Sequence, residues 1–202
     1  MGDLVAVEYV SLDGVMQAPG APDEDPRGGF EHGGWATTRF AADPVAMQAS
    51  MEGHSDTAAL LFGRRTYDQL VGHWLNAPQP NPFADVLRKT PKYVASRTRA
   101  PLTHPHSFLL GENTLESVAS LTKESAGDVV LLGSGMLVRD LAAAGLVDRY
   151  LLSILPVVLG TGTRLFGDTF APMEVVSSTI SPTGTVVATY RVVRERDIDG
   201  QR

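Results

Sequence analysis

The segment DVVLLGSGMLVRDLAAAGLVDRYLLSIL, at Asp128–Leu155, holds the pattern that decides the fold of this chain. It begins with residues typical of a buried strand, which run into the turn Gly133-Ser134-Gly135. Met136–Ala144 then has the composition of a helix that stops at Gly145, and Arg149–Leu155 is a second apolar strand. A strand, a helix and a strand in this order predict two parallel strands joined by a helical crossover.

The same alternation extends through the chain, so the sequence predicts an α/β fold with a mainly parallel central sheet flanked by helices. Asp43 before Pro44 favours a helix start, because Asp is a good cap and Pro suits the first helical position. We expect a single domain over residues 1–196 and a flexible tail at 197–202. A C-terminal antiparallel β-hairpin is expected at Glu174–Ile180 and Thr185–Val193, and further strands at Leu4–Val10, Thr57–Phe62, Lys92–Ala95 and Ser107–Leu110.

Composition excludes several classes of protein. The 202 residues carry a formal net charge of −6, which disfavours general binding of DNA or RNA. The absence of cysteine excludes disulfides, thiolate nucleophiles and cysteine-based metal sites, and no histidine spacing indicates a metal. The longest apolar stretch, Tyr150–Gly160, is too short to cross a bilayer, and no signal peptide is recognisable. We therefore expect a cytoplasmic protein that binds a small molecule and neither nucleic acid nor membrane.

Three segments that follow strands are suited to binding anions. The Gly133-Ser134-Gly135 turn opens a helix, and the free N–H groups of a helix start favour an anion. Gly63-Arg64-Arg65-Thr66 adds two guanidiniums to a similar turn. Ser96 and Arg97 lie in a stretch, between Val86 and Gly111, that contains no acid. Each segment also has a simpler interpretation, as a tight turn or a solvated basic surface, and the sequence leaves both open.

Few residues are candidates for proton transfer or substrate contact. Asp13 ends the first strand beside Gly14, where it either faces a cleft or caps the turn. From Met16 to about Phe40 the chain is rich in glycine and proline, and so long an irregular loop is often functional. An aromatic residue in that loop either covers a flat ligand or packs in a minor core. For Trp35 we predict a lid that faces the substrate.

Together these segments resemble the dihydrofolate reductase superfamily, in particular the reductase (C-terminal) domain of the bifunctional riboflavin-biosynthesis protein RibD. The resemblance covers nearly the whole chain, and it is carried by the order and spacing of four motifs, each of which is weak alone. They are VSLDGVM at Val10–Met16, LLFGRRTYD at Leu60–Asp68, PKYVASRT at Pro91–Thr98, and the segment Val129–Phe166.

The resemblance implies a dihydrofolate reductase-like fold that holds NADPH beside a flat, pterin-like or pyrimidine substrate. It implies phosphate and adenosine contacts on one side of the cofactor and nicotinamide contacts on the other. By position, Gly63, Arg64, Arg65 and Thr66 would bind the phosphates and adenosine side, Ser96 and Arg97 the 2′-phosphate, and Gly133, Ser134, Gly135 and Met136 the pyrophosphate. Leu12, Asp13 and Gly14 would flank the nicotinamide, with Asp13 nearest the substrate, and the segment from Pro156 to Gly162 would border that pocket on its far side.

The predicted function is an NADPH-dependent reductase of a small heterocycle or carbonyl compound, of the riboflavin and folate type. Dihydrofolate reductases bind the pterin with an acid on their first helix, but here the best-aligned position is about Met47. The proton donor is open between Asp13 and ordered water. A non-catalytic nucleotide-binding sensor or stress protein is the alternative, and a sugar-phosphate binding module is a third. A homodimer is expected, paired through Tyr150–Leu155 and the terminal hairpin as in riboflavin reductases.

Overall fold

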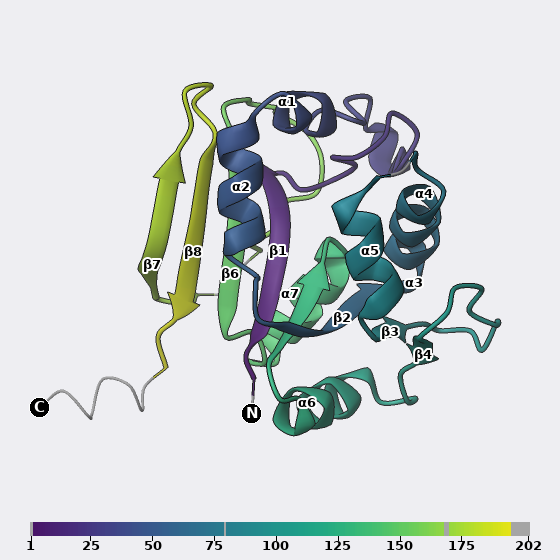
Figure 1. Cartoon of the computed structure of the whole chain (residues 1–202). Coiled ribbons are helices and arrows are strands. Elements are labelled where there is room, and N and C mark those ends of the chain that lie inside the picture. Colours follow the sequence, from purple (N-terminus) through teal and green to yellow (C-terminus); the bar gives the residue numbers. More distant parts are fainter. Residues whose placement is uncertain (1, 79, 168–169, 195–202) are drawn as a thin grey trace, which may run out of the picture.

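The computed structural model describes residues 2–78, 80–167 and 170–194. Their strands form one sheet in the order β4-β3-β2-β5-β1-β6-β8-β7 (Figure 1). The pairs among β1 to β6 are parallel, whereas β8 pairs antiparallel with β6 and with β7. This confirms the predicted α/β fold with its C-terminal hairpin. The strands are β1 (Leu4–Ser11), β2 (Thr57–Gly63), β3 (Lys92–Ala95), β4 (Ser107–Leu109), β5 (Asp128–Leu132), β6 (Arg149–Leu155), β7 (Met173–Ile180) and β8 (Val186–Val192).

Helices cover both faces of the sheet. Tyr67, from the helical segment after β2, packs in one core cluster with Val5 of β1. Val138 of α7 packs in the other cluster with Ala6. The helices are α1 (Thr37–Ala41), α2 (Pro44–Glu52), α3 (Arg64–Thr66), α4 (Gly72–Leu75), α5 (Pro82–Lys89), α6 (Thr114–Glu124) and α7 (Gly135–Ala143); a π-helical turn at Tyr67–Val71 joins α3 to α4, and Arg27–Gly29 is a 3₁₀ turn.

The apolar run of β1 is explained by burial on both of its sides. Leu4 and Ala6 belong to the cluster beneath α6 and α7, whereas Val5 and Val7 belong to the cluster on the opposite face. Successive side chains of a strand point to opposite faces, and so a strand covered by helices on both sides needs apolar residues at consecutive positions.

The predicted helix start at Asp43 is confirmed, and the same side chain also holds the C-terminal hairpin. One carboxylate oxygen accepts a hydrogen bond from the Ala46 N–H at 3.0 Å, as expected of a helix cap. The other accepts hydrogen bonds from the hydroxyls of Ser181 and Thr183, in the turn between β7 and β8. Asp43 is buried, and so one capping residue fixes α2 against a hairpin far along the chain.

Two helices lie where we expected irregular chain. α1 lies within the loop that follows β1, and α5 begins at Pro82, in a proline-rich stretch for which no helix was predicted. The Asn81 side chain accepts a hydrogen bond from the Ala84 N–H at 3.1 Å. This is the same cap-then-proline start as at Asp43-Pro44, and the stretch is helical because Ala84 and Leu87 are buried against the sheet.

The position of β6 corrects one expectation about assembly. Tyr150–Leu155 lies between β1 and β8, and both of its edges are paired within the chain. It therefore has no free edge for a second copy, and β7 is the strand at that end of the sheet. The predicted tail at 197–202 lies outside the described residues. No helix within the described ranges is long and apolar enough to span a membrane.

Candidate functional site

The carboxyl ends of β1, β2 and β5 lie side by side, because these three strands are parallel neighbours. β5 ends at Leu132, which pairs with Val7, and β1 continues past it to Ser11. β5 and β1 are adjacent at the centre of this edge. β2 lies next to β5 on one side, and β6 lies next to β1 on the other. Open parallel sheets bind their ligands at such a point.

A hydrogen bond joins two of the turns that the sequence singled out. The Ser134 hydroxyl, in the turn after β5, accepts a hydrogen bond from the Gly63 N–H at the end of β2, at 2.8 Å. A Cβ on Gly133 would lie 3.3 Å from the Thr66 methyl, and so the two turns are in close contact. The N–H of Gly63 is thereby already used within the chain and is not a free donor for a phosphate.

The turn before α7 has backbone donors without acceptors. Gly133 and Ser134 both have positive φ, 54° and 64°, and a left-handed serine is uncommon and often marks a functional site. The N–H groups of Gly135 and Met136 lie in the first turn of α7, and neither makes a hydrogen bond to any residue that the structure describes. Both are suited to an anion, since the helix dipole adds positive potential there.

Gly135 also has a packing role that its sequence neighbours do not indicate. A Cβ on Gly135 would lie 2.3 Å from the sulfur of Met16, which is buried. Met16 therefore packs directly on the backbone at the start of α7, and it holds the beginning of the long loop there. A glycine is needed for this contact irrespective of any ligand.

The two arginines after β2 have partners within the protein. Arg64 forms an ion pair with Asp68 at 2.8 Å and donates to the backbone carbonyls of Ala100 and Pro101. Arg65 forms an ion pair with Asp25 of the long loop at 3.3 Å. Local acids thus pair with both guanidiniums, and the binding of cofactor phosphates by Arg64 and Arg65 stays a prediction.

Arg97, by contrast, has no hydrogen bond or ion pair to the part of the chain that the structure describes. It lines a cavity of about 290 Å³ together with Ser96, just beyond the end of β3. Arg99 lines the same cavity but forms an ion pair with Glu112 at 3.2 Å. One uncompensated guanidinium beside a hydroxyl is the arrangement that binds a phosphate monoester.

Asp13 connects the turn after β1 to the segment that follows β6. One carboxylate oxygen accepts from the Ser11 hydroxyl at 2.7 Å and from the Leu159 N–H at 3.1 Å, and the other accepts from the Gly160 N–H at 2.9 Å. These hydrogen bonds, that from Ser11 first, lower the pKa of Asp13 to about 2. At neutral pH the carboxyl is ionised, which is unsuited to the proton-donor role that we had considered for it.

The neighbours of Asp13 form the same connection. The Leu12 N–H donates to the Val157 carbonyl at 2.9 Å, while the Leu12 side chain is exposed. Gly14 has a φ of 80°, and its carbonyl accepts from the Leu165 N–H. Pro156 lies beside Gly184 of the β7–β8 turn, since a Cβ on that glycine would be 3.6 Å from the proline ring.

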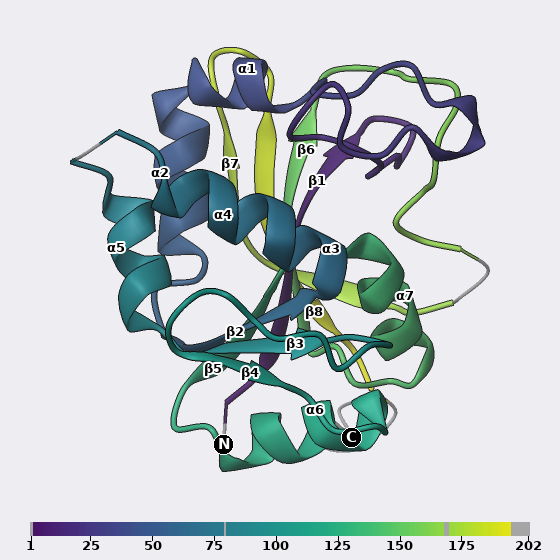
Figure 2. The ribbon, with the colours of Figure 1, turned by 90° about the vertical axis from the view of Figure 1, so that its right-hand side faces the viewer.

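The loop at residues 16–40, which we call the cover loop, runs alongside the segment after β6 above the carboxyl end of β1 (Figure 2). The buried side chain of Gln17 holds the two together. Its carbonyl accepts from the N–H and hydroxyl of Thr163, both at 2.9 Å, and its amide donates to the carbonyls of Asp25 and Arg27. Nothing in the sequence marks Gln17 as a linking residue, because its four partners are backbone groups or lie far along the chain.

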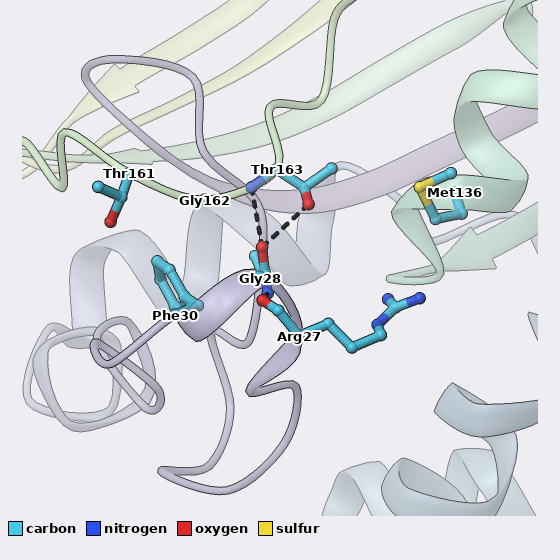
Figure 3. Close-up of a pocket in the computed structure, with 8 residues that line it drawn as sticks. Arg27, Gly28, Phe30, Met136, Thr161, Gly162 and Thr163 are labelled. Carbon is cyan, nitrogen blue, oxygen red and sulfur yellow. Dashed lines mark hydrogen bonds between the residues drawn. The ribbon is translucent and has the colours of Figure 1, made fainter.

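A second cavity, of about 330 Å³, lies between the cover loop, the start of α7 and the segment after β6 (Figure 3). Arg27 and Phe30 of the loop, Met136 of α7, and Thr161 and Thr163 line it. Figure 3 shows the Arg27 side chain extending toward the side of the cavity where Met136 lies. Met136 of the predicted pyrophosphate turn and residues 161–163 of the segment after β6 thus line the same cavity. Pro156, at the start of that segment, does not line it.

Trp35 is fixed within the cover loop. Its indole N–H donates to the Gln17 carbonyl at 2.8 Å, and its ring packs against the cluster of Val15, Ala18 and Phe30. These contacts correspond to the minor-core alternative more than to a mobile lid. Among the described residues no group of acids and histidines is arranged to bind a metal ion.

Comparisons with known proteins agree with this architecture. Residues 4–187 match the family described as the RibD C-terminal domain. An uncharacterized protein of Bacillus subtilis, YyaP, is 34% identical over 113 residues, which make up 54% of this chain and 59% of that protein. The chain thus matches less than two thirds of the length of this curated relative.

Solved structures share the fold at low sequence identity. A putative riboflavin biosynthesis protein from Shewanella sp. PV-4 has a TM-score of 0.66 at 21% identity, over 96% of this chain and 100% of that one. Dihydrofolate reductase from Enterococcus faecalis, complexed with NADP(H), has a TM-score of 0.56 at 14% identity, over 96% and 98%. A pyrimidine reductase-like protein from Corynebacterium diphtheriae has a TM-score of 0.58 at 14% identity, over 96% and 93%.

Proposed function

Since this chain belongs to the RibD C-terminal domain family, we propose that it is a reductase that transfers a hydride from NADPH to a small heterocyclic or carbonyl substrate. The family supports a reductase of the riboflavin and folate type. NADPH, the pterin-like or pyrimidine character of the substrate and the roles of individual residues are parts of the proposal.

One observation carries the choice of cofactor. Arg97 is an unpaired guanidinium in a cavity after β3, and the free N–H groups of Gly135 and Met136 lie along the same edge of the sheet. A dinucleotide with an extra phosphate has two anionic groups that suit these two sites. The Enterococcus faecalis dihydrofolate reductase, which shares the fold, is complexed with NADP(H).

Bound NADPH would supply the hydride, and the chain would bind and orient it. Ser96 and Arg97 would bind the 2′-phosphate, and the turn at Gly133–Met136 the pyrophosphate. The turn at Leu12–Gly14 would flank the nicotinamide. Asp13 would act in this scheme as a positioning residue, because its ionised carboxylate fixes that turn to Leu159 and Gly160.

A homodimer in the cytoplasm completes the proposal. β7 is an edge strand, and Val175, Val176 and Ile180 on it are 61%, 58% and 73% exposed. An exposed apolar edge is open to pairing with a second copy. Sedimentation of the wild-type protein and of Val176→Lys tests this part, since a dimer built on β7 should dissociate in the variant.

The function itself is tested by measuring reduced-dinucleotide binding, and then NADPH oxidation with a panel of pterins, pyrimidines and carbonyl compounds. Turnover with one class identifies the substrate type. Tight NADPH binding without turnover on any of them would favour the nucleotide-binding sensor, and binding of sugar phosphates in preference to dinucleotides would favour the third alternative.

A further inference from the structure

Glu8 is an acid in the middle of the otherwise apolar core strand β1, and only 4% of its surface is exposed. It is the first residue of β1 beyond the end of β5. Val7 pairs with Leu132, the last residue of β5. Gly133, which follows Leu132, donates its N–H to the Val7 carbonyl at 3.1 Å, and no residue of β5 pairs with Glu8. Glu8 therefore lies where the sheet opens into the candidate site.

The surroundings of Glu8 are mostly apolar. Alternation along β1 puts it on the face of Ala6 and Val10, which carries the core cluster with Val138 of α7 and Tyr150 of β6. Burial raises the pKa of Tyr150 to about 12, and so this phenol is uncharged. The charged group that acts on Glu8 is Glu24 of the cover loop. Met16, the first residue of the cover loop, belongs to the same cluster and packs on Gly135, so this face of β1 leads to the start of α7.

The Glu8 carboxyl has no partner. Its buried Oε1 atom makes no hydrogen bond to any described residue. Among the described residues it is the only buried side-chain nitrogen or oxygen without a hydrogen-bond partner. Burial, and secondly the charge of Glu24, raise the pKa of Glu8 to about 8. The group is therefore mostly a neutral acid at pH 7, which avoids the cost of an unpaired buried charge. An orphaned polar atom at a ligand site calls for a partner that the ligand supplies.

We propose that Glu8 is the proton donor of the reaction and hydrogen-bonds to the nitrogen or oxygen of a substrate C=N or C=O group. This inference rests on the proposed function. As the hydride with its electron pair reaches the carbon, the π electrons of the double bond move to the heteroatom. The O–H bond of Glu8 breaks, its proton joins that heteroatom, and Glu8 is left as a carboxylate. Oxidised dinucleotide is the second product, and solvent reprotonates Glu8 after release.

This assignment also narrows the substrate class. Of the two acids at the carboxyl end of β1, Asp13 is ionised, whereas Glu8 carries a proton at neutral pH. The apolar surroundings of Glu8 disfavour a substrate with a carboxylate or phosphate next to the reacting bond, because that charge would be buried without a partner. An uncharged or cationic heterocyclic imine or carbonyl fits best.

The first test measures protonation without turnover. Protein labelled with ¹³C at the glutamate carboxyls is titrated by NMR as wild type, Glu8→Gln and Glu24→Gln. We expect one glutamate signal to titrate near pH 8, to vanish in Glu8→Gln and to titrate at lower pH in Glu24→Gln. If every glutamate titrates in the ordinary range, the proposal is wrong.

The second test separates proton donation from binding. Glu8→Gln keeps the shape and a hydrogen-bond donor but has no proton to give, and Glu124→Gln, an exposed glutamate of α6, is the matched control. With the substrate found for the wild type, kcat of Glu8→Gln should fall about 10²- to 10⁴-fold while its NADPH Kd stays within about twofold. An unchanged kcat would overturn the role of Glu8 alone, whereas a wild type that binds no NADPH would overturn the proposed function.

Discussion

The Ser134 hydroxyl accepts a hydrogen bond from the Gly63 N–H at 2.8 Å and so fastens the turn after β5 to the turn after β2. Ser134 holds a left-handed conformation, with φ at 64°. Its side chain faces the neighbouring turn and does not cap its own helix, α7. One residue thus orients both the donors of α7 and the start of the helix that carries Arg64 and Arg65.

Replacing this hydroxyl should loosen both turns. Ser134→Ala leaves the Gly63 N–H without its acceptor, and we expect a loss of about 1 kcal/mol in unfolding free energy and weaker NADPH binding. Ser134→Gly also lacks the hydroxyl but relieves the left-handed strain, and it should be the more stable of the two by up to about 1 kcal/mol. Urea unfolding and NADPH titration measure these effects, and a wild-type affinity in Ser134→Ala would contradict the role of the hydroxyl.

The unpaired guanidinium of Arg97 should select the phosphorylated cofactor. Losing a charge-assisted contact costs roughly 1.5–3 kcal/mol, and so Arg97→Ala should weaken NADPH binding about ten- to a hundredfold and leave NADH binding unchanged. Lys89→Ala removes an exposed charge from the same acid-free stretch and serves as the control. Equal affinity of the wild type for NADPH and NADH would disprove the assignment.

Glu8 should make the wild-type protein less stable as the pH rises. Its folded pKa, about 8, lies above the ordinary value of 4.5, so the native state holds the proton more tightly than the unfolded chain. The resulting stabilisation is present below pH 4.5 and is lost as the pH rises through 8. Between pH 5 and 8, the unfolding free energy of the wild type, measured with denaturant, should fall by roughly 2–4 kcal/mol relative to that of Glu8→Gln. Parallel curves for the two proteins would show that Glu8 is not buried as an acid.

Trp35 should stabilise the cover loop. Trp35→Phe loses the hydrogen bond to the Gln17 carbonyl, at a cost of about 1 kcal/mol, and Trp35→Ala also loses the packing on Phe30. We expect faster proteolysis within residues 16–40 in Trp35→Ala, together with a higher KM. A fall in kcat with unchanged proteolysis and Tm would instead support the mobile lid that the sequence suggested.

Much of the fold was determined locally. Consecutive apolar residues predicted β1 and β5, the Asp43-Pro44 pair predicted the start of α2, and Gly133-Ser134-Gly135 predicted the turn before α7. These features depend on backbone propensity, capping and periodicity, which neighbouring residues encode. The same signals were present at Asn81-Pro82, where the surrounding prolines obscured them.

The state of each candidate site residue, in contrast, was decided by distant partners. Hydrogen bonds from the Ser11 hydroxyl and from the Leu159 and Gly160 N–H groups lower the pKa of Asp13. Arg65 pairs with Asp25 of the cover loop, whereas Arg97 has no partner among the described residues. Glu8 was only one residue of an apolar strand until its register with β5 put it at the opening of the sheet. The sequence by itself determined which side chains are available, but charge, burial and hydrogen bonding depend on distances between segments that only the tertiary structure brings together.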